Sequence, residues 1–202
     1  MQKTLLLGST SFSRQKLLKQ AHISFMVTGH EADETACDWG MPFSKLLQTI
    51  AVDKMNHVII PEGKHEQELF VLTADTLNLD ENGGVHGKPT DKEDAFQKLR
   101  TLKNGKAGTA FCLDKKVNKA GVWVTDTRIV EYVEASYIFD MPDVWIERYL
   151  NSFERYDQVS GGISVEGYGA QFLKTVDGSY STILGLPMYE LRLALEKLGF
   201  YS

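Results

Sequence analysis

The segment from Val71 to Pro89 combines an acidic side chain in an apolar stretch with a lysine just ahead of a predicted helix. Asp75 follows the apolar residues 69–72, which predict a buried strand, and a buried carboxylate is rarely left unpaired. Lys88 follows a turn-rich run and precedes a helix expected to begin near Asp91. The two residues could form a buried ion pair, or a metal-binding acid and a phosphate-binding lysine in one cleft.

Other residues near the start of the chain also suit phosphate binding. Ser9, Thr10 and Ser11 follow a short apolar strand, and Arg14 lies one turn into the helix that comes next. A helix N-terminus offers free N–H groups and a partial positive charge, and arginine adds a two-pronged donor. Lys54 lies late in a second predicted helix. The alternatives are simple helix capping for the serines and a solvated helix lysine for Lys54.

Two further acids complete the candidate chemistry. The carboxylates of Glu34 and Asp75 are hard oxygen ligands, which favour magnesium or manganese, and such an ion would bridge phosphate groups. Glu166 lies in the glycine-rich segment from Ser160 to Gly169. Its carboxylate could accept hydrogen bonds from a guanine edge and would suit the positive charge of a methylated ring. The alternative for Glu166 is a loop acid in water.

Several familiar sites do not fit the sequence. The run GGVHGKP lacks the spacing of a phosphate-binding P-loop, and Pro89 stands where that loop has Ser or Thr. Leu77 stands where an aspartyl-phosphate enzyme would carry a second acid. The five histidines show no HxxxH or HxH spacing, so we expect surface or loop residues rather than metal ligands.

Composition narrows the class of protein. With 202 residues, 43% of them hydrophobic, and 5 prolines, we expect a single globular domain over residues 1–202. The net charge of −5 argues against nucleic acid as a partner. Cys37 and Cys112 have no CxxC spacing, which favours a reducing cytoplasm. No apolar run approaches the roughly 20 residues of a membrane span, so we expect no membrane association.

Strands and helices alternate along the first half of the chain. We expect strands at residues 4–7, 25–27, 69–72, 106–117, 122–135 and 170–176, and helices after residue 11, at 42–58, 91–102 and 141–150, and after 187. Residues 118–121, NKAG, predict a hairpin turn. This long hairpin makes an all-parallel sheet unexpected and predicts a mixed α/β sheet.

In this order, the motifs resemble the Maf, or septum-formation-like, family of nucleotide pyrophosphatases over nearly the whole chain. LLLGSTSFSRQKLL resembles the family's LASxSPRRxxLL, and ADE at 32–34 resembles its acidic DE. Residues 51–54 resemble its helix with a late lysine, and ADT and HGKP resemble its central acid and lysine motifs. GLPMYEL at 185–191 resembles the closing GLPL.

The resemblance implies a fold, an activity and a set of roles. The fold is an elongated, twisted mixed sheet with flanking helices in two lobes around a cleft, as in inosine triphosphate pyrophosphatases, often as a homodimer. The implied reaction hydrolyses a nucleoside triphosphate to the monophosphate and pyrophosphate with a divalent metal, Mg or Mn. Asp75 and Glu34 would hold the metal, and Asp75 could be base, ligand or both. Arg14, Lys54, Lys88 and the turn at residues 9–11 would hold the triphosphate.

Some residues point to a branch of the family or depart from it. Ser13 and Glu166 resemble the branch that acts on 7-methyl-GTP more than the branch that acts on dTTP and UTP. Phe12 replaces the usual proline, and Ser13 removes a possible phosphate-binding cation. GTAF at residues 108–111 stands where TG is usual.

The glycine-rich segment also differs from the family. It reads DQVSGGIS where the family has DKAG or DCAG, so Asp157 fits only with a one-residue shift, and Gln158 otherwise takes its place. Two alternatives to a 7-methyl-GTP enzyme therefore stay open. One is a housecleaning enzyme without that preference, and the other is a weakly active or non-catalytic nucleotide-binding regulatory protein.

Overall fold

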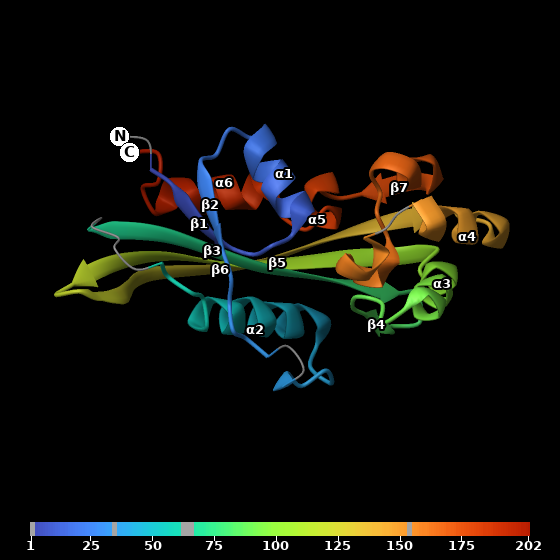
Figure 1. Cartoon of the computed structure of the whole chain (residues 1–202), viewed down its shortest axis with the longest axis horizontal. Coiled ribbons are helices and arrows are strands. Elements are labelled where there is room, and N and C mark those ends of the chain that lie inside the picture. Colours follow the sequence, from blue (N-terminus) through green and yellow to red (C-terminus); the bar gives the residue numbers. More distant parts are fainter. Residues whose placement is uncertain (1–2, 34–35, 62–66, 153–154) are drawn as a thin grey trace. The chain divides into compact units, whose positions relative to one another are not determined.

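The computed structural model describes residues 3–33, 36–61, 67–152 and 155–202. Within them the expected mixed α/β architecture is confirmed, because helices flank a seven-stranded sheet of order β2-β1-β3-β5-β6-β7, with β4 paired to β3 outside that path (Figure 1). Strand β1 pairs parallel with β2 and β3. Strands β4 and β7 pair antiparallel with β3 and β6.

Most elements lie where the sequence predicts them. The strands are β1 (Leu5–Gly8), β2 (Phe25–Thr28), β3 (Glu68–Asp80), β4 (Val85–His86), β5 (Asn104–Lys119), β6 (Val122–Phe139) and β7 (Leu173–Asp177). The α-helices are α1 (Phe12–Gln20), α2 (Phe43–Asn56), α3 (Lys92–Thr101), α4 (Asp143–Ser152), α5 (Tyr180–Ile183) and α6 (Met188–Lys197). Short 3-10 helices are η2 (Tyr156–Gln158), η3 (Ser160–Gly162) and η4 (Gly167–Phe172).

Several boundaries differ from expectation. Asp75 was expected at or near the end of a strand, but β3 continues for five more residues, to Asp80. Leu77 and Asn78, in this continuation of the strand, are also buried. The strand expected from residue 170 begins only at Leu173, since η4 occupies the preceding residues. Helix α4 was expected from residue 141 but begins at Asp143. The Trp145 backbone N–H, in its first turn, donates a hydrogen bond to the carbonyl of Pro142.

The chain divides into two compact units. The first comprises Met1–Asp75, Ala110–Tyr132 and Gly185–Ser202, and the second comprises Thr76–Thr109 and Val133–Leu184. Strands β3, β5 and β6 contribute residues to both units. None of the helices in the described residues is both long enough and apolar enough to span a membrane.

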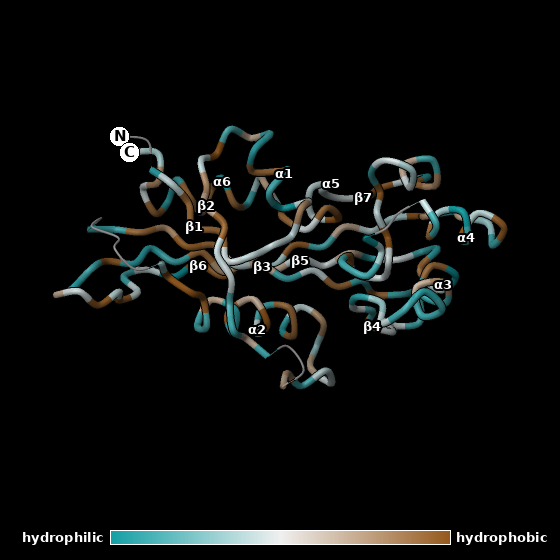
Figure 2. Tube along the Cα trace, viewed as in Figure 1, coloured by the Kyte–Doolittle hydropathy of each residue, from teal (hydrophilic) through white to brown (hydrophobic). Residues whose placement is uncertain are grey.

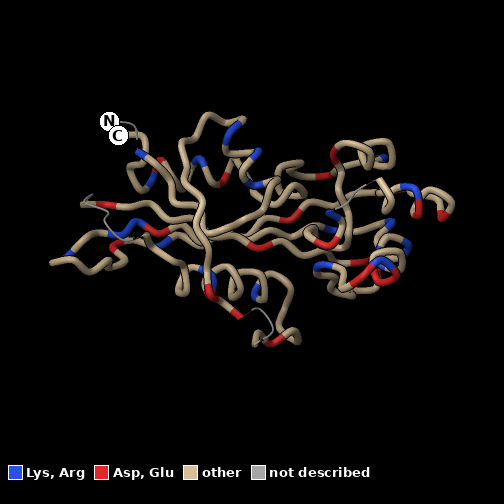
Figure 3. Tube along the Cα trace, viewed as in Figure 1, with Lys and Arg blue, Asp and Glu red and all other residues tan. Residues whose placement is uncertain are grey.

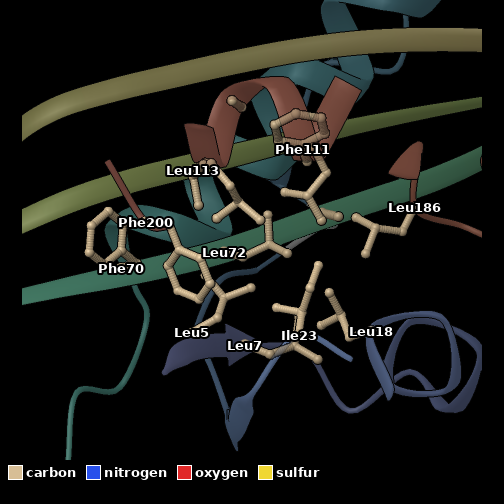
Figure 4. Close-up of a cluster of buried hydrophobic side chains, with 14 of the residues drawn as sticks. Leu5, Leu7, Leu18, Ile23, Phe70, Leu72, Phe111, Leu113, Leu186 and Phe200 are labelled. Atoms are coloured by element: carbon tan, nitrogen blue, oxygen red, sulfur yellow. The ribbon is translucent and has the colours of Figure 1, made fainter. Parts of the chain in front are cut away.

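In the first unit, the alternation of side chains along the strands separates two packed faces. Helices α1 and α6 cover one face of the sheet and α2 lies on the other (Figure 1). Apolar residues concentrate on the central strands (Figure 2). The cluster under α1 and α6 is shown in Figure 4 and includes Leu5, Leu7, Leu18, Ile23, Phe70, Leu72, Phe111, Leu113, Leu186 and Phe200.

The second unit has its own core, which is rich in aromatic rings. Phe139 lies in edge-to-face contact with Tyr149 and Phe172, at centroid distances of 6.4 Å and 6.2 Å. Leu99 of α3 and Ile163 belong to the same cluster. Lysine, arginine and acidic residues occur together along α3 (Figure 3), as expected for a helix with one solvated face. Val165, next to Glu166, also belongs to this core.

Candidate active site

The acid singled out from the sequence is paired with a lysine. Lys54 Nζ lies 2.5 Å from Asp75 Oδ1, and the two residues are only 4% and 7% exposed. The cation expected beside Asp75 is therefore present, but it comes from α2 rather than from Lys88. The alternative of a solvated Lys54 is wrong, because the sheet covers this face of α2.

A second contact fixes how α2 lies on β3. The Thr73 hydroxyl donates a 2.7 Å hydrogen bond to the carbonyl of Ala51, three residues before Lys54. Thr73 and Asp75 are two residues apart on β3, so their side chains leave the same face of the sheet. Ala51 and Lys54 lie almost one turn apart on α2 and share one helix face. The ion pair follows from this alignment.

The turn between β1 and α1 forms a compact polar group. Ser11 is the N-cap of α1, and its hydroxyl accepts from the Arg14 backbone N–H at 3.5 Å, so the capping alternative is confirmed for this serine. The Ser9 hydroxyl accepts from Ser11 N at 3.2 Å and from Arg14 Nη1 at 3.1 Å. Arg14 Nε donates to the carbonyl of Gly185 at 2.8 Å. Arg14, 8% exposed, thereby ties the opening motif to the start of the closing one.

Strand register brings this turn close to the ion pair. In the parallel pairing of β1 with β3, Leu7 lies opposite Leu72, so Ser9 and Asp75 are two and three residues further along neighbouring strands. Gly8 allows the close approach, since a Cβ there would lie 2.9 Å from the Thr73 methyl group and 3.0 Å from Val58. Within the first unit, the structure therefore gathers Ser9, Arg14, Lys54 and Asp75 at the same end of β1 and β3.

Lys88 and Glu166 belong to the second unit. Lys88 is exposed in the turn between β4 and α3, and its carbonyl accepts a 3.2 Å bond from Lys98 Nζ. Glu166 is half-buried directly before η4, and its carbonyl accepts from Gly169 N at 3.2 Å. Gly169 has no room for a side chain, because a Cβ would lie 1.8 Å from the carbonyl oxygen of Ser164.

The expected metal site is described only in part. Glu34 lies outside the described residues, and those residues contain no group of three or more His, Cys, Asp or Glu side chains that could hold a metal ion. Asp75 nevertheless fits one ligand position, since it offers carboxylate oxygen at the site. Magnesium is commonly held by one or two carboxylates, with waters and substrate phosphates as the other ligands.

Sequence reasoning missed a second buried acid. Asp114 has no exposed surface. Its carboxylate accepts hydrogen bonds from Arg128 Nε at 2.7 Å and from Arg128 Nη2 at 2.8 Å, and Lys116 Nζ lies 3.0 Å from its Oδ2. On β5, Asp114 directly follows the buried run of residues 107–113, and an acid at the end of such a run was the signal for it. Nearby Cys112 is inert as a nucleophile at neutral pH, because burial raises its thiol pKa to about 12.

Sequence reasoning also missed the partners of the glycine-rich segment. Asn78, Tyr149 and His86 each make a hydrogen bond with it. His86 was expected as a surface or loop residue, but it is in β4, partly buried and 2.7 Å from Asp80. That hydrogen bond holds the Asp80 pKa below its usual value. A polar residue at a buried strand position was the available signal for Asn78.

Comparison with known proteins covers nearly the whole chain. The sequence model of the Maf-like protein family matches residues 4–198. A protein of Acholeplasma laidlawii named dTTP/UTP pyrophosphatase is 34% identical over 98% of this chain and 96% of its own length. A protein of the same name from Caldicellulosiruptor saccharolyticus is 31% identical over 98% of this chain and 96% of its own length. Another, from Hydrogenovibrio crunogenus, is 31% identical over 100% of both chains. The chain belongs to the Maf-like family.

Proposed function

We propose that this chain hydrolyses a nucleoside triphosphate to the monophosphate and pyrophosphate. The observation that carries the proposal is the buried Lys54–Asp75 pair beside the turn formed by residues 9–11. It supports the proposal because an acid, a cation and backbone donors that lie close together could hold a triphosphate during attack by water. The full-length relatives named dTTP/UTP pyrophosphatases support the same reaction class.

The roles follow from the chemistry of each group. Water attacks the α-phosphorus, a new P–O bond forms, and the bond to the bridging oxygen of the β-phosphate breaks, so that pyrophosphate leaves. In this proposal Asp75 orients the water and accepts its proton. Lys54 balances the Asp75 charge before substrate binds and then attracts phosphate oxygens. Arg14 holds the phosphate-binding turn through Ser9, and Lys88 contacts the phosphate chain.

A divalent ion, magnesium or manganese, fits this arrangement as a cofactor. Asp75 would hold it together with Glu34 and the phosphate oxygens of the substrate. When bound, it would neutralise charge on the triphosphate and favour ionisation of the attacking water. Titration of the apoprotein with manganese, followed by paramagnetic relaxation of water protons, tests whether Asp75→Asn weakens metal binding.

The preferred base has two candidates, each carried by its own observation. The names of the relatives favour dTTP and UTP. Glu166 favours 7-methyl-GTP, because a half-buried carboxylate can accept hydrogen bonds from the guanine edge and attract the charged, methylated ring. Glu166→Gln keeps the acceptor oxygen and removes the charge. It should therefore lower selectivity for 7-methyl-GTP if Glu166 reads this base.

The test is a substrate panel with the full chain. Pyrophosphate and monophosphate are measured with dTTP, UTP, 7-methyl-GTP, GTP, ATP and CTP, in magnesium and in manganese. We expect equal amounts of the two products, and we expect Asp75→Asn to lower kcat by about 10²- to 10⁴-fold. Asp126→Asn is the matched control, because Asp126 is an exposed carboxylate of β6.

Folding must be checked beside activity. Asp75→Asn leaves Lys54 buried without its counter-charge, which costs about 3–5 kcal/mol of stability, so assays run well below the variant's unfolding temperature. Near-normal turnover in folded Asp75→Asn would remove Asp75 from the mechanism. Binding of triphosphates without pyrophosphate release would instead establish the nucleotide-binding regulatory protein, the alternative suggested by Ser13 and the altered glycine-rich segment.

A further inference from the structure

The turn that carries Lys88 is held by the glycine-rich segment. The Ser160 hydroxyl donates to the carbonyl of His86 at 2.8 Å, and the Gly161 backbone N–H donates to the carbonyl of Gly87 at 2.9 Å. These two carbonyls directly precede Lys88. These two hydrogen bonds fix two successive peptide planes just before Lys88. The backbone direction at Lys88 is therefore set by η3, which lies more than 70 residues later in the sequence.

Ser160 is itself oriented by a buried chain of hydrogen bonds. Asn78 Nδ2 donates to the Ser160 carbonyl at 3.0 Å and to its hydroxyl oxygen at 2.9 Å. The Tyr137 hydroxyl donates to Asn78 Oδ1 at 2.9 Å. Burial raises the pKa of Tyr137, so this hydroxyl keeps its proton across the physiological range.

Each bond in this chain has one possible direction. A carbonyl oxygen can only accept, so the Ser160 carbonyl requires the amide nitrogen of Asn78 to face it, and Asn78 Oδ1 must then face Tyr137. For the same reason the Ser160 hydroxyl must be the donor in its hydrogen bond to the backbone carbonyl of His86. Asn78 and Tyr137 are 5% and 2% exposed, so water does not compete freely for these positions. The Ser160 hydroxyl is thus a fixed donor rather than a rotating one.

The opposite side of the β3–β4 hairpin is braced separately. His86 Nε2 lies 2.7 Å from Asp80 Oδ2, and Asp80 Oδ1 accepts from the backbone N–H groups of Asn82 and Gly84 at 2.8 Å each. The hairpin is therefore closed at its tip by Asp80. Ser160 and Gly161 hold its exit, where Lys88 follows.

We infer that Ser160 is a positioning residue for Lys88, fixing the turn from which the lysine reaches the phosphate chain of the substrate. This inference rests on the proposed function, because that function gives Lys88 its ligand. An exposed lysine on a four-carbon side chain gains little from its charge unless its backbone is held, since a displacement of about 1 Å can cost a large share of catalysis.

The decisive experiment is a double-mutant cycle between Ser160→Ala and Lys88→Met in the full chain. Steady-state pyrophosphate release is measured with the best triphosphate of the panel. In the parent background, Ser160→Ala should lower kcat/KM by about tenfold, and Lys88→Met should lower it further. In the Lys88→Met background, Ser160→Ala should have less than about a twofold effect, because no lysine is left to position.

Two further variants separate positioning from general stability. Ser152→Ala removes a serine hydroxyl that donates to the carbonyl of Tyr149 in the same unit, and it should leave kcat/KM within about twofold of the parent. Ser160→Thr keeps the hydroxyl and should recover much of the loss seen in Ser160→Ala. Equal losses from Ser160→Ala in both Lys88 backgrounds would overturn the inference while leaving the proposed hydrolysis intact.

A separate measurement covers the case in which the parent chain releases no pyrophosphate. That result would overturn the proposed function, and the inference would then be judged on hydrogen exchange of residues 85–90. Faster exchange there in Ser160→Ala, but not in Ser152→Ala, would support the role of Ser160 in ordering the turn. Unchanged exchange would overturn it.

Discussion

At the scale of single residues, Asp114 shows how much a buried charge depends on its partners. Burial alone would raise its pKa, but hydrogen bonds from Arg128, Lys116 and Thr125 outweigh burial and hold the pKa below its usual value. Arg128 also reaches the side chain of Asn56 at the end of α2, at 3.0 Å. The cluster therefore connects β5, β6 and α2 on the face of the sheet that also carries Asp75.

Removing Arg128 should destabilise the protein in a pH-dependent way. Arg128→Met removes two hydrogen-bond donors from the buried Asp114 carboxylate. We expect the free energy of unfolding at pH 7 to fall by about 3 kcal/mol, measured by urea unfolding. The folded pKa of Asp114 is lowered, so its stabilising contribution is complete above the unfolded value near 3.9 and is lost as the pH falls below it. The gap between parent and variant should therefore shrink below about pH 4.

The control for this prediction is Arg100→Met. Arg100 pairs with Asp143 at 3.2 Å, but both side chains are half exposed, so the loss should stay within about 1 kcal/mol. Losses of equal size in the two variants, or a gap independent of pH, would contradict the account of Asp114.

The residue scale also shows what sequence reasoning can reach. A carboxylate after an apolar run predicted that Asp75 would need a cation, and the structure supplies Lys54. Sequence alone could not choose between Lys54 and Lys88, because the choice depends on how α2 lies on β3. For Asp114, the necessary information was its inward-facing place on β5, which requires the register of a 16-residue strand.

At the scale of elements, the short η3 helix depends on glycine. Gly161 has a φ of 65°, and a Cβ there would lie 2.4 Å from Leu102 Cδ1. Leu102 is completely buried, so its side chain cannot move aside without disturbing the second unit's core. The same glycine brings its N–H to the carbonyl of Gly87.

Gly161→Ala should therefore lower the free energy of unfolding by more than the strain of a positive φ would by itself. Gly121→Ala is the matched control, since Gly121 has a φ of 89° and no atom within 4 Å of its would-be Cβ. Both variants strain the backbone, and only Gly161→Ala adds a clash. Thermal unfolding should show about 1–3 kcal/mol more destabilisation for Gly161→Ala, and similar losses would contradict the packing argument.

The elements themselves were largely predictable because their signals are local. Apolar periodicity located α2, α3 and α6 to within a few residues, and the NKAG turn predicted the β5–β6 hairpin. The 3-10 helices were not predicted, and η3 in particular depends on distant partners, Asn78 and Tyr149. The strand expected from residue 170 begins only at Leu173, because η4 occupies residues 167–172.

At the scale of the molecule, the residues proposed to act on substrate come from both units. Arg14, Lys54 and Asp75 belong to the first unit, and Lys88 and Glu166 belong to the second. Asp75 is the last residue of the first segment, on a strand that continues into the second unit. These residues are separated by up to about 150 positions, so their spacing carries no information, and the prediction that they act on one substrate rests on the order of the family motifs.

The most direct test of the central claim is hydrolysis in water enriched with oxygen-18. We expect one labelled oxygen in the nucleoside monophosphate and none in pyrophosphate, because water attacks the α-phosphorus in the proposed reaction. Mass spectrometry of both products gives the answer for the parent chain, and folded Asp75→Asn should give almost no labelled product. Label in pyrophosphate or release of orthophosphate would contradict the proposed reaction.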